Sequence, residues 1–349
     1  MTLLQNEQVV EEKEGGEKQK ISTRGRLLSF RNLLVPKKSE KNLTQLTPVR
    51  NETLPHVPEG LSRYYVMKLI GKGTYGYISR ALDTATGQEM VIKKIMKKQK
   101  SSSEDRIANE IKACARIRTL PGTLRAHGYF ETEEAMFVAM EHIQGKDLYD
   151  LLSERNFTPL SETLSRNIFK QITQSLFHMH NNGVAHKDIK LENIMVDVED
   201  RYRSVLIDFG LAFLFDPAIH SPSSEFCNDY GGSMEYSPPE ILARAPFSPE
   251  KSDVYSLGVT LYCLLIGSFP YPNMTDFKEV VKLTKGKKKR NLKFPLRSMI
   301  SEEARDILRG MLTDCPQNRL SVREILEHKW TVGPVKQTSL PMINNLLIN

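Results

Sequence analysis

Residues 186–193 read His-Lys-Asp-Ile-Lys-Leu-Glu-Asn, and residues 208–210, which begin 15 positions after Asn193, read Asp-Phe-Gly. The first stretch holds a carboxylate, an ammonium and a carboxamide within one loop, which is costly to order unless the loop binds something. The second stretch ends an apolar run, so the carboxylate of Asp208 is expected at the end of a strand. Asn193 and Asp208 together offer the oxygen ligands that Mg²⁺ prefers.

A glycine-rich turn lies upstream of these loops, between two predicted strands. Its residues Gly71, Gly73 and Gly76 would let backbone N–H groups approach phosphate oxygens without a Cβ in the way. Taken alone, the turn fits an ordinary glycine-rich hairpin equally well. No helix follows it, which argues against a dinucleotide-binding turn.

The third predicted strand carries Lys93, and Glu110 lies 17 positions later on a predicted helix. A lysine that points inward from a strand needs a carboxylate partner, because an unpaired buried charge is costly. Glu110 can be that partner. A solvated strand face is the usual place for a lone lysine, and Lys94 on the opposite face illustrates this alternative.

Hydrophobic periodicity divides the chain into a β-rich part and a longer helical part. Strands are expected at residues 64–70, 77–82, 90–95, 128–130 and 136–140. Helices are expected at residues 103–118, 164–180, 253–266 and 302–312. The pattern predicts an α+β protein of two lobes, with a small β-rich N-lobe holding one main helix, a larger and mostly helical C-lobe, and a ligand site between them.

The composition changes at both ends of this region. Residues 1–62 are rich in Glu, Lys, Gln, Ser and Pro, so we expect a disordered tail there. Residues 63–332 are expected to form the folded domain and residues 333–349 a short C-terminal tail. No apolar run reaches the roughly 18 residues that a membrane helix needs, and the N-terminus lacks the features of a secretory signal. We therefore expect neither a membrane span nor secretion.

Cysteine and histidine usage bears on the cellular compartment and on metal binding. The four cysteines show no paired spacing, which argues against a disulfide framework and a cysteine-based zinc site; they are Cys114, Cys227, Cys263 and Cys315. The histidines at 178, 180 and 186 lack the third spaced ligand that a zinc site requires. A reducing compartment follows, so a cytoplasmic or nuclear location is expected.

The net charge of +7 is modest and unevenly distributed. The basic run Lys285–Arg290 could bind nucleic acid or an import receptor, but a solvated loop is the usual meaning of such a run, so nucleic acid is not an expected partner. The basic, partly amphipathic stretch Arg24–Leu34 permits membrane-surface contact, docking or an organelle signal.

Taken in order, these motifs resemble those of the eukaryotic protein kinase family over about residues 64–330. The shared series runs from the glycine-rich loop through the strand lysine, the helix glutamate, the catalytic loop and Asp-Phe-Gly to Pro239-Glu240. The resemblance implies ATP and Mg²⁺ as cofactors, protein substrates, a monomer, and transfer of the γ-phosphate to serine or threonine. The closing segment Glu324–Trp330 is most similar to the calcium/calmodulin-dependent kinase group.

The resemblance also implies roles for individual residues. Asp188 accepts or orients the substrate hydroxyl beside Lys190, and Lys93, held by Glu110, contacts the α- and β-phosphates. Mg²⁺ is expected on Asn193 and Asp208. Residues expected to contact ATP are Ile70, Gly71, Lys72, Gly73, Gly76, Ile78, Lys93, Glu141, Ile143, Asp147 and Asn193. Structural roles are implied for Asp253, which holds the catalytic-loop backbone, for an ion pair between Glu240 and Arg319, and for Met140 as the gatekeeper.

Serine or threonine preference follows from Lys190 and from Ser233, which resembles the family's hydroxyl residue that bonds the catalytic aspartate and this lysine. Two residues depart from the family pattern. Val91 stands where alanine is usual, two places before Lys93. Lys187 stands where arginine is usual, and it offers a point charge instead of a bidentate fork for a phosphate. Activity is therefore expected to depend little on phosphorylation of the segment between Asp208 and Glu240, because Glu225 or Asp229 can pair with Lys187.

A catalytically weak pseudokinase scaffold is the main alternative function. Its usual sign is the loss of the strand lysine, the catalytic aspartate or the metal-binding aspartate, and this chain keeps all three as Lys93, Asp188 and Asp208. A small-molecule kinase is a more distant alternative, because Ser233 and Pro239-Glu240 belong to a peptide-binding segment in the family.

Overall fold

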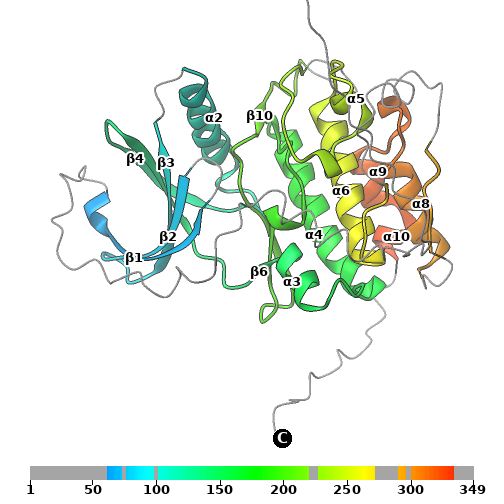
Figure 1. Cartoon of the computed structure of the whole chain (residues 1–349), viewed down its shortest axis with the longest axis horizontal. Coiled ribbons are helices and arrows are strands. Elements are labelled where there is room, and N and C mark those ends of the chain that lie inside the picture. The colour runs from blue at the N-terminus through cyan, green and yellow to red at the C-terminus, as the bar shows by residue number, and fades with distance from the viewer. Residues whose placement is uncertain are drawn as a thin grey trace, which may run out of the picture.

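The computed structural model describes residues 61–72, 76–97, 101–219, 227–271, 290–295 and 300–333. A strand-rich lobe with one long helix lies beside a larger helical lobe (Figure 1). This arrangement confirms the predicted α+β class with a β-rich N-lobe and a mostly helical C-lobe. Residues 1–60 and 334–349, which hold most of the two expected tails, lie outside the described residues.

The N-lobe is built on one antiparallel sheet. Its strands are β1 (Tyr64–Lys72), β2 (Gly76–Asp83), β3 (Glu89–Met96), β4 (Ala126–Glu131) and β5 (Ala135–Glu141), in the order β1-β2-β3-β5-β4. Alternate residues of β3 face opposite sides of the sheet. Ile95 packs with Val138 and Met140 on one side, whereas Ile92 packs with Ala81 on the other.

The long N-lobe helix is α2 (Ser101–Ile117), which confirms the helix expected from residue 103 and begins it two positions earlier. Glu110, Ala113 and Ile117 are buried on its inner face. Near its C-terminal end, Arg116 Nη1 donates hydrogen bonds to the carbonyls of Gly183 and Phe215 at 3.2 and 3.3 Å. Because those carbonyls belong to the C-lobe, this arginine ties the two lobes together.

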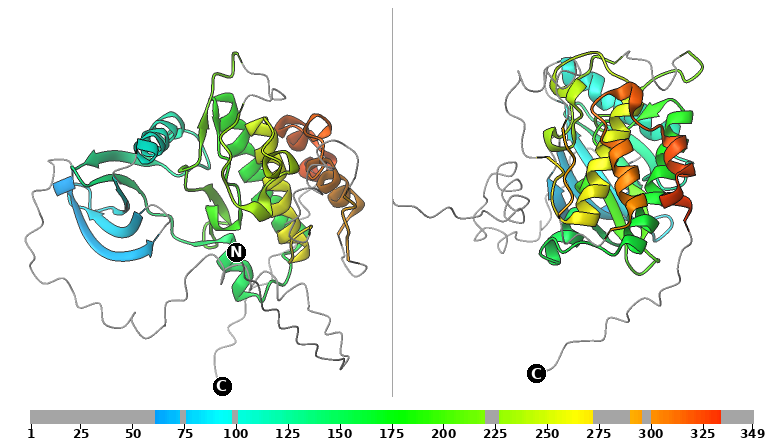
Figure 2. Two further views of the ribbon diagram at one scale, coloured as in Figure 1. Left: turned by 45° about the horizontal axis from the view of Figure 1, so that its top comes forward. Right: turned by 90° about the vertical axis from the view of Figure 1, so that its right-hand side faces the viewer.

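The C-lobe is organised around a buried helix. Its helices are α3 (Leu148–Glu154), α4 (Glu162–Asn181), α5 (Pro239–Leu242), α6 (Pro249–Ile266), α8 (Glu302–Met311), α9 (Val322–Glu327) and α10 (Lys329–Val332). Helix α6 lies between α4 and α8 (Figures 1 and 2) and is buried at every position from Pro249 to Leu265. A helix that is apolar over most of its circumference is expected to be buried in this way. Gly267 ends it with φ +74°, a conformation that glycine adopts without strain.

Five short strands hold the two loops that carry the expected chemistry. Their bounds are β6 (Lys146–Asp147), β7 (Val184–Ala185), β8 (Ile194–Asp197), β9 (Arg203–Leu206) and β10 (Phe213–Leu214). Strand β7 pairs with β10, and β8 lies between β6 and β9. The loop at 186–193 therefore runs from β7 to β8, and the Asp-Phe-Gly segment runs from β9 to β10. Each loop is fixed at both ends by strand pairing, which brings the two loops together.

Single turns of 3₁₀ helix complete the described structure. They are η2 (Leu61–Arg63), η3 (Leu191–Asn193), η4 (Met234–Tyr236) and η5 (Pro316–Asn318). Across the described ranges, none of the helices is at once long and apolar enough to cross a membrane.

Candidate active site

Asp188 lies at the centre of a dense hydrogen-bond network. Its Oδ2 accepts from Lys190 Nζ at 2.6 Å and from Asn193 Nδ2 at 3.0 Å. Its Oδ1 accepts from the backbone N–H of Ser233 at 3.1 Å and from Ser233 Oγ at 3.0 Å. Lys190 Nζ also donates to Ser233 Oγ at 3.0 Å. The structure thus brings Asp188, Lys190 and Ser233 into direct contact, as the sequence predicts, and fixes the carboxylate from two separate segments.

A second cluster joins the N-lobe to the Asp-Phe-Gly segment. Lys93 Nζ on β3 donates to Glu110 Oε1 on α2 and, at 2.8 Å, to Asp208 Oδ1. The side chains of Lys93 and Glu110 are 12% and 8% exposed, whereas that of Asp208 is 51% exposed. The lysine therefore has the partner that its burial requires, and the side chain of Asp208 stays partly exposed.

Burial and neighbouring charges act in opposite directions on the pKa values of this cluster. Burial opposes the charge on Lys93, but the carboxylates of Glu110 and Asp208 outweigh burial and raise the lysine's pKa. Burial raises the pKa of Glu110 in spite of the neighbouring ammonium. Burial also acts to raise the pKa of Asp208, but Lys93 outweighs it, so that this pKa is lowered. Lys93 and Asp208 are consequently both ionised at neutral pH, as a site for phosphates and a cation requires.

Asp253, in the first half of α6, holds the backbone that leads into Asp188. The fully buried carboxylate accepts from the backbone N–H of His186 at 2.8 Å and from that of Lys187 at 2.7 Å. His180 Nε2 lies 2.9 Å from the same carboxylate. The role that the sequence implies for Asp253 therefore has a geometric basis: two N–H groups that no regular element would satisfy find their acceptor in it.

His186 is built into the loop as a structural residue. Its Nε2 lies 3.1 Å from the carbonyl oxygen of Ile207, and its Nδ1 accepts from the backbone N–H of Asp188 at 3.3 Å. Its ring packs on Phe209, with the ring centroids 5.2 Å apart. Both ring nitrogens are thus engaged within the fold.

Asn193 and Asp208 fit a Mg²⁺ site. Asn193 Nδ2 donates to the backbone carbonyl and to the carboxylate of Asp188, which turns the amide oxygen away from these acceptors. The backbone carbonyl of Asn193 accepts from Ile207 N at 3.0 Å, which brings Asp208 next to this loop. Mg²⁺ is usually held by one or two protein oxygens together with substrate phosphates and water, and this pair supplies that number.

Of the residues expected to contact ATP at and beside the glycine-rich turn, all but Gly73 lie on β1 or β2. A Cβ on Gly76 would stand 1.8 Å from the carbonyl oxygen of Lys94, so only glycine fits there. Ile70 is 50% exposed and Ile78 is partly buried at the facing ends of the two strands. Lys72 is exposed, with its Nζ 5.5 Å from the ring centroid of Tyr77. Gly71 lies in β1, and Gly73 lies outside the described residues.

The segment between the lobes carries the remaining predicted contacts. Met140 is 7% exposed and packs with Ile95 and Val138, so its side chain forms part of the N-lobe core. Glu141 ends β5, and its Oε1 accepts from the backbone N–H of Arg125 at 2.9 Å. Ile143 is 6% exposed, which leaves its backbone as the group that could meet a ligand.

Asp147, predicted to contact the ribose, also has a structural task. It is the N-cap of α3, where its Oδ1 accepts from the backbone N–H of Asp150 at 2.7 Å. An N-cap aspartate satisfies one of the helix N–H groups that lack a partner within the helix.

Lys187 has a carboxylate partner without any phosphate. Its Nζ donates to Asp229 Oδ2 at 2.5 Å, and its side chain is 0% exposed while that of Asp229 is 57% exposed. The ammonium also lies 5.8 Å from the ring centroid of Phe213. Of the two partners considered from the sequence, Asp229 makes the contact and Glu225 lies outside the described residues.

The ion pair expected between Glu240 and Arg319 is present and buried. Arg319 Nη1 and Nη2 donate to the two oxygens of Glu240 at 2.7 and 3.1 Å, and the two side chains are 0% and 5% exposed. This bidentate pair joins α5, which follows the Asp188-binding Ser233, to the segment before α9.

Glu192 is a residue to which the sequence assigns no role. It lies in η3, and its Oε2 is buried with no hydrogen-bond partner among the described residues. Burial raises its pKa. The only sequence signal was its position inside the loop at 186–193, because the burial of its carboxylate depends on contacts from distant segments.

The sequence matches the protein kinase domain family over residues 64–331. It is 31% identical over 271 residues to a probable serine/threonine-protein kinase KIN1 homolog of Enterocytozoon bieneusi, which is 78% of this chain and 42% of that protein. It is 32% identical over 270 residues to human NUAK family SNF1-like kinase 1, 77% of this chain and 38% of that protein. It is 31% identical over 284 residues to serine/threonine-protein kinase cds1 of Schizosaccharomyces pombe, 77% of this chain and 58% of that protein.

This chain spans less than two thirds of the length of each of these relatives. The region matched to the family begins at β1, ends within α10 and includes the β3 lysine and both loops of the site. Because that match covers most of the chain and every element that forms the site, the chain belongs to the protein kinase domain family.

Proposed function

We propose that the chain transfers the γ-phosphate of ATP to serine or threonine hydroxyls of protein substrates. The observation that carries the proposal is the network on Asp188, in which Lys190 and Ser233 hold a carboxylate beside the ionised cluster of Lys93 and Asp208. Phosphoryl transfer needs positioned charge more than covalent chemistry, and this arrangement supplies it. The names of the three relatives, all of them kinases, support the same reading.

In the proposed reaction, the substrate hydroxyl oxygen forms a bond to the γ-phosphorus of ATP. The bond from that phosphorus to the oxygen bridging the β- and γ-phosphates breaks, ADP leaves, and the hydroxyl proton passes to Asp188. Lys93 binds the α- and β-phosphates while Glu110 holds it in place. Mg²⁺ held by Asn193 and Asp208 would neutralise charge on the phosphates.

Asp188 has to exchange one hydrogen bond when the substrate arrives. A carboxylate offers about four acceptor positions, and four donors already fill them: Lys190 Nζ, Asn193 Nδ2, Ser233 N and Ser233 Oγ. The hydroxyl of Ser233 is the neutral and freely rotating donor of this set. We infer that the substrate hydroxyl takes its place, while Lys190 keeps the carboxylate oriented.

The remaining ATP contacts are proposed on the residues that the family pattern supplies. Backbone N–H groups of the turn from Gly71 to Gly76 cover the phosphates, and Ile70 and Ile78 flank the adenine. Lys72 is the last residue of β1, next to this turn. The backbone of Glu141 and Ile143 contacts the adenine edge, and Asp147 meets the ribose.

The wider setting is also proposed. The segment Glu324–Trp330 supports a place near the calcium/calmodulin-dependent kinase group. Four unpaired cysteines suit a reducing compartment, so we place the protein in the cytoplasm or the nucleus. Protein substrates, a monomer and no nucleic-acid partner complete the proposal.

The decisive experiment is a radiolabelled ATP assay on peptide libraries that differ only in carrying serine, threonine or tyrosine. We expect Mg²⁺-dependent labelling of serine and threonine peptides, and a fall of about 10²–10⁴-fold in Asp188→Asn, because the general base is lost. Glu303→Gln, which changes an exposed carboxylate on α8, serves as the matched control and keeps its activity. Equal turnover in wild type and Asp188→Asn would refute the assignment and leave the pseudokinase reading.

A binding measurement tests the metal site without relying on turnover. ATP is expected to raise the melting temperature of the wild type more with Mg²⁺ than without it, because only a ligand bound to the folded state stabilises it. Asp208→Asn should lose the Mg²⁺-dependent part of this rise. A rise of the same size in the variant would remove Asp208 from the metal site.

A further inference from the structure

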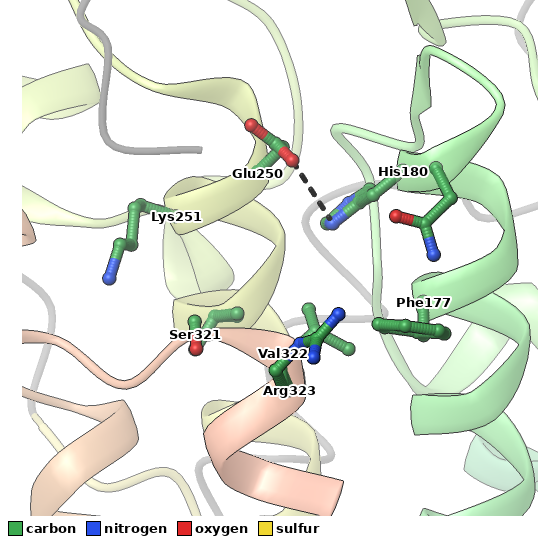
Figure 3. A pocket seen from close by; sticks show the side chains of 9 residues that line it. Phe177, His180, Glu250, Lys251, Ser321, Val322 and Arg323 are labelled. Atoms are coloured by element: carbon green, nitrogen blue, oxygen red, sulfur yellow. Dashed lines mark ion pairs between the residues drawn. The ribbon is translucent and has the colours of Figure 1, made fainter. Parts of the chain in front are cut away.

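A separate pocket lies where the C-terminal end of α4 meets the first turns of α6 and α9 (Figure 3). It encloses about 220 Å³. It is lined by Phe177, His180, Asn181, Glu250, Lys251, Val254, Ser321, Val322 and Arg323. Pockets for drug-sized ligands usually hold about 300–1,000 Å³, so this one suits a smaller group.

The inner end of the pocket holds a carboxylate that lacks a donor. Glu250 is 8% exposed, and its Oε2 is buried with no hydrogen-bond partner within the described residues. Its Oε1 lies 4.0 Å from His180 Nδ1, which is too far for a hydrogen bond, although the two side chains face each other in Figure 3. Burial raises the pKa of Glu250. A buried carboxylate without a donor is costly. Oε1, the oxygen that faces His180, is the one that a donor in the pocket would meet.

In its neutral form, His180 presents a second acceptor to the same space. Its Nε2 lies 2.9 Å from Asp253 Oδ2, and a carboxylate only accepts, so Nε2 carries the hydrogen. In the neutral ring Nδ1 is then an acceptor. Two acceptors 4.0 Å apart, Glu250 Oε1 and His180 Nδ1, can share a single nitrogen that stands about 2.9 Å from each.

We propose that this pocket binds a small ligand with an amine or amidine head on an apolar body. The head donates to Glu250 and to His180 Nδ1, and the body packs against Phe177, Val254 and Val322. A neutral head group could donate, but a cation also compensates the buried carboxylate.

The two lysine and arginine side chains of the lining are compatible with this ligand. Lys251 Nζ donates a hydrogen bond to the carbonyl of Arg319 at 2.5 Å, so it gives no hydrogen bond to Glu250, although its charge still favours the ionised Glu250 carboxylate. The guanidinium of Arg323 lies 5.9 Å from the ring centroid of Phe177. Arg323 disfavours a positive charge near Phe177, which requires the ligand's own charge to lie beside Glu250.

The pocket is connected to the catalytic loop through two residues. Asp253, which receives His180 Nε2, also accepts from the backbone N–H groups of His186 and Lys187. A ligand that donates to His180 Nδ1 polarises the ring and strengthens its bond to Asp253. We expect a bound ligand to change the peptide phosphorylation rate. This expectation rests on the proposed kinase function, whereas the expectation that the ligand binds does not.

Benzamidine is a suitable probe, because it joins an amidinium to an aromatic ring. We expect it to raise the melting temperature of the full-length chain by about 2–5 °C at ten times its dissociation constant. Benzoate, which has the same ring and the opposite charge, should give no such rise. Glu250→Gln should weaken benzamidine binding by about 10–100-fold, because a charge-assisted hydrogen bond is lost. Glu303→Gln, an exposed carboxylate away from the pocket, should bind as the wild type does.

A second variant keeps the test independent of Glu250. Val322→Phe fills the pocket with a larger apolar side chain and should abolish the benzamidine response while the chain stays folded. The site is refuted if benzamidine fails to bind the wild type, if Glu250→Gln binds it equally well, or if benzoate binds instead. Binding that depends on Glu250 but leaves the peptide phosphorylation rate unchanged would overturn the connection to the catalytic loop.

Discussion

Replacement of Asp229 by asparagine tests whether this chain carries its own substitute for a phosphate. Lys187 is fully buried, its ammonium pairs with Asp229 at 2.5 Å, and its backbone N–H is held by Asp253 at 2.7 Å. A phosphate on the segment after Asp208 would normally supply the negative charge that such a cation needs. With Asp229 in place, the loop has that charge already. We therefore expect activity to depend on Asp229 and only weakly on phosphorylation.

The size of the effect follows from the burial of the two partners. Removing one partner of a fully buried ion pair costs about 3–5 kcal/mol. Asp229 is 57% exposed, so water already competes for its carboxylate, and we place the cost at about 1–2 kcal/mol. If losing the pair destabilises the active conformation of the segment between Asp208 and Glu240 by this amount, kcat/KM drops by about 5–30-fold.

The assay compares kcat/KM for a serine peptide before and after phosphatase treatment, in the wild type and in Asp229→Asn. Phosphatase should change the wild-type value by less than about twofold. In a double-mutant cycle with Lys187→Met, the two losses should not add, because both remove the same contact. Asp216→Asn, an exposed aspartate in the same segment, is the matched control. A large loss after phosphatase, restored by rephosphorylation at Ser223 or Ser224, would refute the reasoning.

Three further outcomes are expected. Glu240→Ala leaves the buried Arg319 without its bidentate partner, so the free energy of unfolding in urea should fall by about 3–5 kcal/mol; a fall below about 1 kcal/mol would contradict the pair's structural role. Cys315 is exposed, whereas burial raises the pKa of Cys114 to about 12 and shields the thiols of Cys227 and Cys263. Iodoacetamide at pH 8 should therefore modify one cysteine per folded chain, as counted by mass spectrometry. Rapid labelling of more thiols would contradict the burial. Deletion of residues 1–61 should leave the melting temperature unchanged and kcat/KM within about twofold of wild type, and a lost melting transition would show that the domain begins earlier.

The strands, helices and motifs on this chain were predictable from local apolar patterns, from the cost of an unpaired buried charge and from the family resemblance. Strand β3 and helix α2 follow from alternating and helical apolar patterns, and both predicted bounds lie within two residues of the observed ones. The pairing of Lys93 with Glu110 follows from the cost of an unpaired buried charge. The network of Asp188 with Lys190 and Ser233 was predicted from the family resemblance and is present.

Features that depend on distant segments were not predictable in the same way. The central helix was expected from residue 253 but begins at Pro249, because the polar residues of its first turns are buried by specific contacts. Lys251 Nζ, for example, reaches the carbonyl of Arg319, 68 positions away. The facing of His180 and Glu250 likewise joins residues 70 positions apart in sequence. A hydropathy pattern does not indicate which distant residues form such pairs.

Two residues of the site, Lys187 and Asp208, have strained backbone conformations that contacts from other segments hold in place. Lys187 and Asp208 have φ of +65° and +64°, a region that costs a residue other than glycine about 1–3 kcal/mol. Asp253 holds Lys187 in this conformation through the backbone, whereas Lys93 holds Asp208 through its carboxylate. Lys93 also binds Glu110 on α2, so a shift of that helix weakens the contact that keeps Asp208 in its strained conformation. The position of the N-lobe helix and the orientation of the proposed metal ligand are therefore coupled through one ammonium group.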